Sequence, residues 1–369
     1  MKIIVIGAGL AGAATAHALA GRGCEVTVLQ ASAAPGLQPI PRTTPSAGLP
    51  VGLMAPHHAA DAQAPGNISQ LSRLGLAATT AAAQALLIEG QDWLPCGALQ
   101  RAGKLGPQAH WFAQAAWVKP AALVAAWLAH PRITLRYGTA VQRLQRARGQ
   151  AQAWQALDGN GTQLAQAQAV VLANAAQAEL LWARIAAADG SSPPPALPLH
   201  QVAGQVIMGP WTAAWQALWP QLLPELAAHR PAHATGQATG HASHAQPFCA
   251  VNGNGHFIPA VPWPGGPIWL SGSTYEHEVD APQATTAGLH TNLQRLQQLL
   301  PAAAQLLAEQ HHAGQLHGWA GSRCTTRDRI PLVGAAGARH APGIYLCTAM
   351  GSRGLSYAAI CGQQLAAMI

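Results

Sequence analysis

Three glycines near the N-terminus, at a spacing that suits phosphate binding, are the first residues that point to chemistry. Gly7, Gly9 and Gly12 follow an apolar run and precede an alanine-rich stretch. A glycine at the first position permits a tight turn, the second lets a pyrophosphate approach the backbone, and the third lets a helix pack closely on a strand. The N–H groups of Leu10 and Ala11 would then open a helix and face the phosphates. The spacing therefore predicts a dinucleotide-binding loop.

This loop needs a strand before it, a helix after it and a second strand beyond, and the sequence supplies all three. Residues 2–6 are apolar, residues 10–20 favour a helix, and residues 25–29 form a second apolar run. A signal peptide has an apolar core that three glycines would weaken, and a transmembrane span needs about 20 uninterrupted apolar residues. We therefore expect a mature, cytoplasmic chain with no membrane partner.

The residue at the end of the second predicted strand distinguishes between dinucleotides. Folds of this type place an acid there to bind ribose hydroxyls, whereas this sequence has Gln30. A glutamine carbonyl can still accept a hydrogen bond from a ribose hydroxyl, but without the charge the contact is weaker. No arginine stands beside it to bind a 2′-phosphate, so the sequence favours FAD or NAD over NADP.

The composition limits the other classes of site. A chain of 369 residues can form two lobes with a sizeable core, and half of this chain is hydrophobic while only 9% is charged. The six cysteines contain no CxxC pair and no regular spacing. They therefore predict reduced, mostly buried thiols rather than a disulfide framework or a zinc site, and we expect no metal.

The positive charge is distributed unevenly. The net charge is +7, and no acidic residue lies between Asp92 and Asp158. The basic residues in that stretch are Arg101, Lys104, Lys119, Arg132, Arg136, Arg143, Arg146 and Arg148. A polyanion such as RNA suits a field of this kind. The alternative is a set of arginines scattered over different faces, and charge alone does not separate the two.

The rest of the chain alternates strand-like and helical patterns. We predict a helix at 119–128, a strand at 133–137, a hairpin of 140–146 and 151–157 around Gly149, a buried parallel strand at 169–173, and strands of a second, antiparallel sheet at 197–208 and 268–274. Residues 210–247 are rich in Pro, Ala, Gln and His, which predicts a flexible insertion. Its histidines have neither helical HxxxH spacing nor an acid partner, so a metal site is not expected there.

Several of these stretches resemble the D-amino-acid and glycine oxidase superfamily of FAD enzymes. They are the N-terminal glycine loop, AVVLANA at 169–175, LHQVAGQV at 199–206 and GWAGSRCTTRDRIPLVG at 318–334. The resemblance implies an α/β fold with a Rossmann-like FAD-binding domain and a substrate domain built on a mixed or antiparallel sheet. We assign residues 1–90, 130–200 and 318–369 to the FAD-binding domain, and 91–129 and 201–317 to the substrate domain.

Three further stretches look like one particular family. They are SAGLPVGLMAPHH at 46–58, GHFIPAVP with WLSGSTYEHEV at 255–279, and CTAMGSRGLSYAAICGQQLAA at 347–367. They resemble the FAD-dependent oxidoreductase half of the bifunctional tRNA wobble-uridine enzyme, the MnmC family. Because the flavin fingerprint begins at Met1, we expect this chain to lack the methyltransferase half of those enzymes and to have a separate methyltransferase polypeptide as a partner.

The resemblance implies a substrate and a reaction. The substrate would be a tRNA wobble uridine that carries a carboxymethylaminomethyl group, which is a glycine attached through its nitrogen. Oxidation of the carbon between nitrogen and carboxylate, followed by hydrolysis of the imine, would leave aminomethyl-uridine and glyoxylate. The flavin carries this chemistry, and the protein orients the substrate.

Two residues are implied as the catalytic contacts. Arg323, in GWAGSRC, stands where the glycine-oxidase-like enzymes place a carboxylate-binding arginine, and a guanidinium can bind a carboxylate through two parallel hydrogen bonds. A structural pair with Asp328 is the alternative for Arg323. We expect Arg327 and Asp328 to form an internal ion pair. Tyr275 falls on a substrate-domain strand and would hydrogen-bond the substrate, although packing is an equal alternative.

The remaining predicted site residues concern the cofactor. Besides the glycine loop and Gln30, the resemblance implies FAD contacts at Ser46, Gly52, Val141, Ala173, Gly351, Ser352, Arg353, Gly354 and Leu355. Backbone N–H groups of the loop at 351–355 would stabilise negative charge on the reduced ring.

Two other functions remain open from the sequence. One is an oxidase of a free small amine such as glycine, sarcosine or a D-amino acid, and the other is a flavin-binding protein without catalysis.

Overall fold

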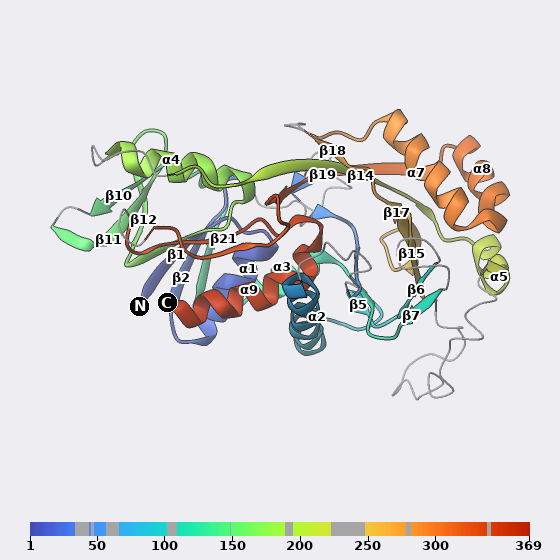
Figure 1. The fold of residues 1–369 in the computed structure, drawn as a ribbon, viewed down its shortest axis with the longest axis horizontal. Helices are drawn as coiled ribbons and strands as arrows, with labels where there is room; N and C mark the ends of the chain where they lie inside the picture. The colour runs from blue at the N-terminus through green and yellow to red at the C-terminus, as the bar shows by residue number, and fades with distance from the viewer. Residues whose placement is uncertain are drawn as a thin grey trace.

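A six-stranded sheet forms the centre of one lobe. The computed structural model describes residues 1–33, 44–45, 48–56, 66–101, 109–147, 149–188, 195–222, 248–277, 282–337 and 341–369. The strand order is β20 (Leu332–Ala335), β21 (Ile344–Thr348), β13 (Ala169–Leu172), β1 (Lys2–Ile6), β2 (Glu25–Leu29) and β9 (Ile133–Arg136). Only β20 runs antiparallel to its neighbour. Helices cover the sheet in Figure 1, and both termini lie in this lobe.

The alternation of side chains along β1 explains why both faces of this sheet are covered. Ile3 and Val5 belong to a core formed with the helices, whereas Ile4 and Ile6 belong to a second core on the opposite face. The helices are α1 (Leu10–Gly21), α2 (Gly66–Leu86), α3 (Pro120–Leu128) and α9 (Gly354–Met368). Successive residues of a strand point to opposite faces, so a continuous apolar strand needs cover on both sides.

The opposite face is covered by a small antiparallel sheet and a helix. The sheet contains β10 (Arg143–Ala147), β11 (Gln150–Leu157) and β12 (Gln163–Ala167), and a 3₁₀ turn η2 (Ala175–Gln177) leads into α4 (Ala178–Ala188). Trp154 and Trp182 are both buried in this second core. The predicted hairpin around Gly149 is therefore confirmed as β10 and β11.

A second, larger sheet crosses the molecule toward the other lobe (Figure 1). Its order is β3 (Thr44–Pro45), β19 (His317–Thr325), β14 (His200–Pro210), β17 (Ile268–Gly272), β16 (Gly255–Val261), β15 (Ala250–Gly253), β6 (Ala98–Gln100) and β7 (His110–Phe112), with β18 (Glu276–His277) paired to β14. The pairs β19–β14–β17–β16–β15 are antiparallel. A separate three-stranded sheet consists of β4 (Gly52–Met54), β8 (Ala116–Val118) and β5 (Trp93–Leu94), in that order.

Helices and an aromatic cluster complete the second lobe. The helices are α5 (Ala213–Leu222), α7 (Thr286–Leu299) and α8 (Ala304–His312), with the 3₁₀ turn η4 (Pro301–Ala303) between the last two. Trp211, Trp215 and Trp219 pack together with Phe257 and Trp269, with ring centroids 5.3–6.4 Å apart. Four-residue spacing places such side chains on one helix face, where burial of aromatic surface stabilises the helix.

The fold class expected from the sequence is confirmed: a Rossmann-like α/β lobe adjoins a lobe built on a largely antiparallel sheet. The domain boundaries stay a prediction. α3, which those boundaries place in the substrate domain, contributes Leu123 and Trp127 to the core of the parallel sheet. The predicted flexible insertion is wrong for residues 213–222, since these form α5 with buried tryptophans. Its remainder, residues 223–247, lies outside the described residues.

Two expected features of the chain as a whole can also be compared with the structure. All six cysteines are free, and five of them are buried. Within the described ranges, no helix is both long enough and apolar enough to span a bilayer.

Candidate active site

A cavity of about 3230 Å³ lies between the two lobes. Its wall includes the loop after β1, the start of α1, the end of β2, the loop after β13, and the η5–α9 segment, where η5 is Gly351–Arg353. Parts of β14, β16 and β19 from the larger sheet form the opposite wall. The carboxyl ends of parallel strands are the usual ligand-binding edge of such sheets.

The glycine loop has the geometry that the sequence predicts. Gly7 has φ +103°, and a Cβ there would lie 2.7 Å from the carbonyl oxygen of Ala173. A Cβ on Gly12 would lie 1.8 Å from the carbonyl oxygen of Gly7, so α1 can approach the loop only with glycine at this position. Gly12 accordingly packs inside and does not line the cavity.

The start of α1 is open toward the cavity. A Cβ on Gly9 would meet no atom within 4 Å, and no side chain caps the helix at this residue. Gly9, Leu10 and Ala11 all line the cavity. An uncapped helix N-terminus presents N–H donors and a positive dipole end, which suits a pyrophosphate. These residues therefore fit the dinucleotide end of FAD.

Gln30 lines the same part of the cavity but already has protein partners. Its Oε1 accepts a hydrogen bond of 2.7 Å from the N–H of Ala8, and its Nε2 donates one of 2.8 Å to Ser32 Oγ. The side chain thus ties the end of β2 to the glycine loop. The ribose contact that the sequence suggests would use the second lone pair of the same oxygen.

The other predicted cofactor residues also converge on the cavity. Those that line it are Gly52, Val141, Ala173, Gly351, Ser352, Arg353, Gly354 and Leu355. Ser46 lies outside the described residues. Two buried polar atoms on this wall have no hydrogen-bond partner within the described structure, namely Asn174 Oδ1 and Tyr357 Oη. A buried polar atom without a partner is costly, and a bound ligand would satisfy it.

Arg323 lies on the opposite wall, on β19, and its positive charge faces neutral partners. Its Nη2 donates a 2.7 Å hydrogen bond to Ser273 Oγ, and its Nη1 lies 3.4 Å from the carbonyl oxygen of Ala203. No acid pairs with it among the residues that the structure describes. Burial lowers the pKa of this guanidinium, and Tyr275 partly offsets that shift. The expected alternative, a structural pair with Asp328, is wrong.

Tyr275 follows β17 and packs against this arginine. The Arg323 guanidinium lies 4.8 Å from the centroid of the Tyr275 ring, a cation–π distance. The tyrosine side chain is nonetheless 59% exposed and lines the cavity. An exposed ring beside a cavity is available to a ligand, whereas a packing residue would be buried.

His256, on β16, was not identified from the sequence. It lines the cavity, and its Nε2 is buried without a partner in the described structure. Burial and the charge of Arg323 lower its pKa to about 4, while a hydrogen bond with the backbone of Gly272 acts in the opposite direction. Because Nε2 has no partner, this bond falls to Nδ1, and Nε2 of the neutral ring is a buried acceptor without a donor in the cavity wall.

Two more arginines, from elements distant in the sequence, also line the cavity. Arg295 of α7 donates a 2.6 Å hydrogen bond to the carbonyl oxygen of Ser273, whose hydroxyl binds Arg323. Burial lowers the pKa of the Arg353 guanidinium, Tyr357 and Tyr275 raise it, and Arg329 lowers it again. The signal for Arg295 was absent from the sequence, because nothing local relates α7 to the end of β17.

The expected ion pair between Arg327 and Asp328 is wrong. Asp328 Oδ1 instead accepts hydrogen bonds from Thr326 Oγ1 at 2.7 Å and from the N–H of Ile330 at 3.0 Å. These bonds, the hydroxyl bond first, lower the pKa of the Asp328 carboxyl. The carboxylate therefore folds the loop after β19 on itself, because local N–H and O–H donors reach it at turn geometry.

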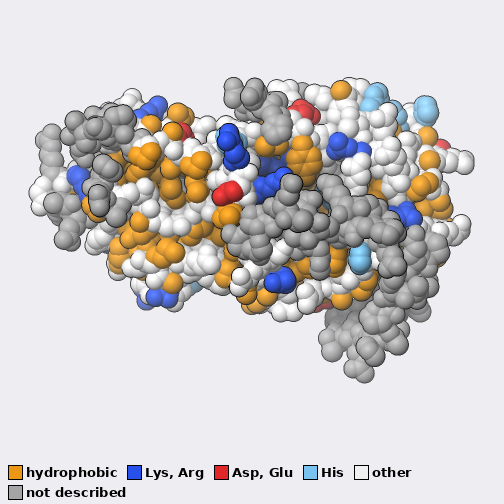
Figure 2. All heavy atoms as spheres, in the orientation of Figure 1, with side chains coloured by type: hydrophobic (Ala, Val, Ile, Leu, Met, Phe, Trp, Pro, Cys, Tyr) orange, Lys and Arg blue, Asp and Glu red, His pale blue; other side chains and the backbone are white. Residues whose placement is uncertain are grey.

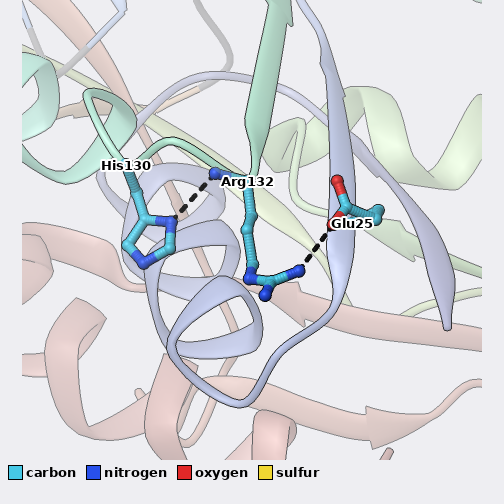
Figure 3. Close-up of polar contacts among 3 residues, drawn as sticks. All are labelled: Glu25, His130 and Arg132. Carbon is cyan, nitrogen blue, oxygen red and sulfur yellow. Dashed lines mark hydrogen bonds and ion pairs between the residues drawn. The ribbon is translucent and has the colours of Figure 1, made fainter.

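The arginines of the acid-free stretch serve different parts of the fold. Arg132 pairs with Glu25 at 2.7 Å, while its N–H donates to Nδ1 of His130 (Figure 3). Arg101 donates to the carbonyl oxygen of Leu299, Arg136 to that of Leu164, and Arg146 to that of Pro342. Arg148 lies outside the described residues. Among the described residues, Arg101, Arg132, Arg136 and Arg146 are therefore scattered over different parts of the fold.

No group of three or more His, Cys, Asp or Glu side chains that could hold a metal occurs in the described part of the chain. The histidines at 229, 233, 241 and 244, which the sequence places in the insertion, lie outside it.

Comparison with known families gives two overlapping matches. A family model described as FAD dependent oxidoreductase matches residues 72–368, and one described as NAD(P)-binding Rossmann-like domain matches residues 5–57. The first match covers most of the chain, and it includes Arg323, Tyr275 and the loop at 351–355.

Curated relatives carry a more specific name. The chain is 36% identical over 405 residues to the tRNA 5-methylaminomethyl-2-thiouridine biosynthesis bifunctional protein MnmC of Polaromonas naphthalenivorans (strain CJ2), and 37% identical over 374 residues to that of Albidiferax ferrireducens (strain ATCC BAA-621 / DSM 15236 / T118). These alignments cover 100% and 98% of this chain but only 56% and 54% of the relatives. The chain thus spans about half the length of the relatives it matches. The resemblance to the MnmC family is confirmed.

Solved structures show the same fold at low sequence identity. Glycine oxidase from Geobacillus kaustophilus superposes with a TM-score of 0.68 at 16% identity, covering 100% of this chain and 94% of that one. Iminodiacetate oxidase from Chelativorans sp. BNC1 gives 0.66 at 17% identity, covering 99% and 94%.

Proposed function

Because the chain belongs to the FAD dependent oxidoreductase family, whose model matches residues 72–368, we propose that it oxidises the carboxymethylaminomethyl group of a tRNA wobble uridine. The products are aminomethyl-uridine and glyoxylate. FAD is the cofactor of this family, and the residues around the glycine loop fit it. The tRNA substrate is supported by the name of the relatives, and a cytoplasmic location is part of the same proposal.

The observation that carries the proposal is the half-buried charge of Arg323, which has no acidic partner among the described residues. A guanidinium withdrawn from water without a counter-ion is unfavourable, and an anionic ligand relieves that cost. Its two terminal nitrogens use one neutral partner each, so N–H donors remain for two parallel bonds to a carboxylate. The N-bound glycine of the proposed substrate offers such a carboxylate. Arg323 would fix the adjacent carbon in one place.

His256 supplies the second anchor of the proposed geometry. Its unpartnered Nε2 accepts the hydrogen of the secondary amine, whose lone pair is then directed away from the ring, while the nearby charge of Arg323 favours the neutral amine over an ammonium. Arg323 and His256 then hold the two ends of the N–CH₂–COO⁻ unit. FAD, when bound, supplies the two-electron acceptor for the carbon between them. Loss of two electrons and two protons from the C–N unit yields an imine, which water cleaves to amine and glyoxylate.

A methyltransferase is the proposed partner in the same reaction sequence. The aminomethyl product is a primary amine, whereas the name of the relatives specifies a methylaminomethyl group. The step that consumes this product is therefore N-methylation. Nothing in the cavity described here is assigned to that step.

The test is mass spectrometry of nucleosides from tRNA that carries carboxymethylaminomethyl-uridine, after incubation with the FAD-loaded protein. We expect loss of that nucleoside, appearance of aminomethyl-uridine and release of glyoxylate. Glycine and sarcosine, offered separately, test oxidation of a free small amine. Turnover of these with untouched tRNA would replace the proposal with the free-amine oxidase, and no turnover of either would indicate a flavoprotein without catalysis.

Variants of Arg323 test whether this residue binds the substrate carboxylate. Arg323→Ala should keep its FAD and its fold, since the residue lies across the cavity from the glycine loop. Removing one partner of a buried charge-assisted pair costs about 2–5 kcal/mol, so kcat/KM should fall by about 30-fold or more. Arg323→Lys should recover little, because an ammonium lacks the planar fork. Normal turnover in Arg323→Ala would assign the carboxylate to another cation, with Arg353 next.

A further inference from the structure

Two exposed arginines flank Asp328 in the loop that follows β19. Arg327 and Arg329 both line the mouth of the cavity, and both are solvent-exposed. The carboxylate between them is held by Thr326 and Ile330, so it braces the loop instead of pairing with either arginine. In the described part of the chain, neither guanidinium has a side-chain or carbonyl partner. The hydrogen bonds of Asp328 therefore hold the loop in one conformation, in which both guanidinium groups are exposed at the cavity.

The loop lies next to other positive charge and an exposed ring. Arg329 and Tyr275 both act electrostatically on Arg353, which places all three at one edge of the cavity. Tyr275 in turn stacks on Arg323. Figure 2 shows Lys and Arg side chains gathered in the middle of the face, around the region where Figure 1 labels β18 and β19. Asp328 is the acid between these arginines, but its carboxylate is hydrogen-bonded within the loop, and Arg327, Arg329 and Arg353 outnumber it, so the edge favours an anionic partner.

We infer that Arg327, Arg329 and Tyr275 form an RNA-binding rim that holds the single-stranded loop around the target uridine. The inference rests on the proposed function. The two guanidiniums bind backbone phosphates on either side of the uridine, and the exposed Tyr275 ring stacks on a base at the entrance. Arg323 lies behind this ring, within reach of the group that the uridine carries into the cavity.

The chemistry of the rim favours single-stranded RNA over other polyanions. Cations that track a backbone, combined with an aromatic ring on which a base stacks, are the common elements of single-strand recognition. An acidic peptide would use the arginines but would leave the ring without a flat partner. The rim also lies outside the acid-free stretch, in which Arg101, Arg132 and Arg146 have partners elsewhere in the fold.

The test compares Arg327→Gln/Arg329→Gln with Arg22→Gln/Arg73→Gln, in which two exposed arginines that do not line the cavity are neutralised. Binding of a synthetic anticodon stem-loop RNA is measured by fluorescence anisotropy over a range of salt. Each single-strand phosphate contact contributes about 0.7 to the slope of log K against log salt. The rim variant should lose about 1.4 in slope, which corresponds to about 25-fold in affinity at about 0.1 M relative to 1 M salt.

Oxidation of the free carboxymethylaminomethyl-uridine nucleoside separates binding from chemistry. The rim variant should oxidise the nucleoside like the wild type and retain its FAD, while kcat/KM for the stem-loop RNA falls with the affinity. Arg327→Lys/Arg329→Lys should keep most of the RNA affinity, since phosphate also binds an ammonium. Tyr275→Phe should keep the RNA affinity and Tyr275→Ala should lower it, because stacking needs the ring.

Three results would overturn the inference. They are an unchanged salt slope in the rim variant, an equal loss in the Arg22/Arg73 control, and equal loss of nucleoside oxidation with loss of FAD. Competition by polyglutamate as strong as that by RNA would replace the proposed partner with an acidic peptide. Failure of the proposed function has a different signature, in which the wild type binds the stem-loop through the rim but oxidises neither the RNA nor the nucleoside.

Discussion

Arg323 and His256 occupy one wall of the cavity and differ in how they respond to burial. Burial lowers the pKa of both, but the guanidinium starts so high that it stays protonated, whereas His256 titrates at about 4 and stays neutral. The cation also disfavours a second positive charge on the imidazole. The pair therefore offers a ligand one permanent charge and one neutral acceptor, which matches the carboxylate and the amine N–H of an N-substituted glycine.

Protonation of His256 should lower the folding stability of the protein over a defined pH range. The pKa of this residue is about 4 in the folded state, against 6.5 for an ordinary histidine. Between these values the unfolded chain binds a proton that the folded chain excludes, so stability falls as the pH falls from about 6.5 to about 4. The full difference corresponds to about 3 kcal/mol. Above about pH 6.5 the contribution is complete and constant.

His256→Gln removes this titration. We expect the melting temperature of wild type to drop more than that of His256→Gln between about pH 7 and about pH 4.5. The measurement is differential scanning calorimetry of both FAD-loaded proteins in matched buffers. The variant should also raise the KM for the nucleoside, because a glutamine carbonyl places its lone pairs elsewhere. Identical drops in melting temperature would mean that His256 titrates normally and is accessible to water.

At the scale of elements, the pairing of β14 with β19 determines where Arg323 points. Val202 lies opposite Arg323 in the register, and Gly204 lies opposite Gly321. A Cβ on Gly204 would lie 2.2 Å from Nη1 of Arg323 and 2.6 Å from the carbonyl oxygen of Thr274. The absence of a side chain at Gly204 thus makes room for the guanidinium, and β17, which pairs with β14, brings Ser273 within hydrogen-bond distance of it.

Gly204→Ala tests this dependence without changing any group that contacts the ligand. The added methyl group must displace the guanidinium, and misplacement by about 1 Å can cost roughly 100-fold in rate. We expect kcat/KM for the nucleoside to fall by that order while the FAD content is unchanged. Gly21→Ala is the matched control, since a Cβ there meets nothing within 4 Å. Full activity in Gly204→Ala would show that the position of Arg323 is not limiting.

At the scale of the whole molecule, the cavity is shared between two sheets with different tasks. The parallel sheet and α1 supply the dinucleotide end, whereas β14, β16 and β19 supply the substrate end. The η5–α9 segment returns the chain from the last strand to the cavity, and α9 packs on α1 and α2 (Figure 1). A ligand that bridges both walls would connect the two lobes.

FAD should therefore act as a structural cross-link as well as a cofactor. We expect the purified protein to be yellow and to release its flavin on denaturation, since no His or Cys stands beside the glycine loop to link it covalently. A ligand at 100 times its Kd adds about 2.7 kcal/mol of stability, so removal of FAD should lower the melting temperature. Flavin fluorescence of the supernatant after denaturation measures the release. Flavin that remains with the precipitated chain would contradict this expectation.

The sequence by itself determined the parts that depend on local spacing. The glycine loop, the helix at 120–128 and the strands β13, β14 and β17 follow from hydrophobic periodicity and from the backbone freedom of glycine. Both are properties of a few neighbouring residues, so the sequence alone reveals them. Arg323 and Tyr275 were found through a resemblance in short motifs. The same local signals could not locate the RNA-binding charge, because a count of arginines contains no information about their partners.

Only the tertiary structure decided which distant side chains meet. His256, Ser273 and Arg295 reach Arg323 because β14, β16, β17 and β19 are neighbours in one sheet and α7 packs beside it. A tertiary contact with Glu25 likewise satisfied Arg132, whereas Arg327 and Arg329 were left at the rim. The physical reason is that the environment of a charge depends on burial and on atoms within a few ångströms, and sheet pairing brings those atoms from positions dozens of residues apart.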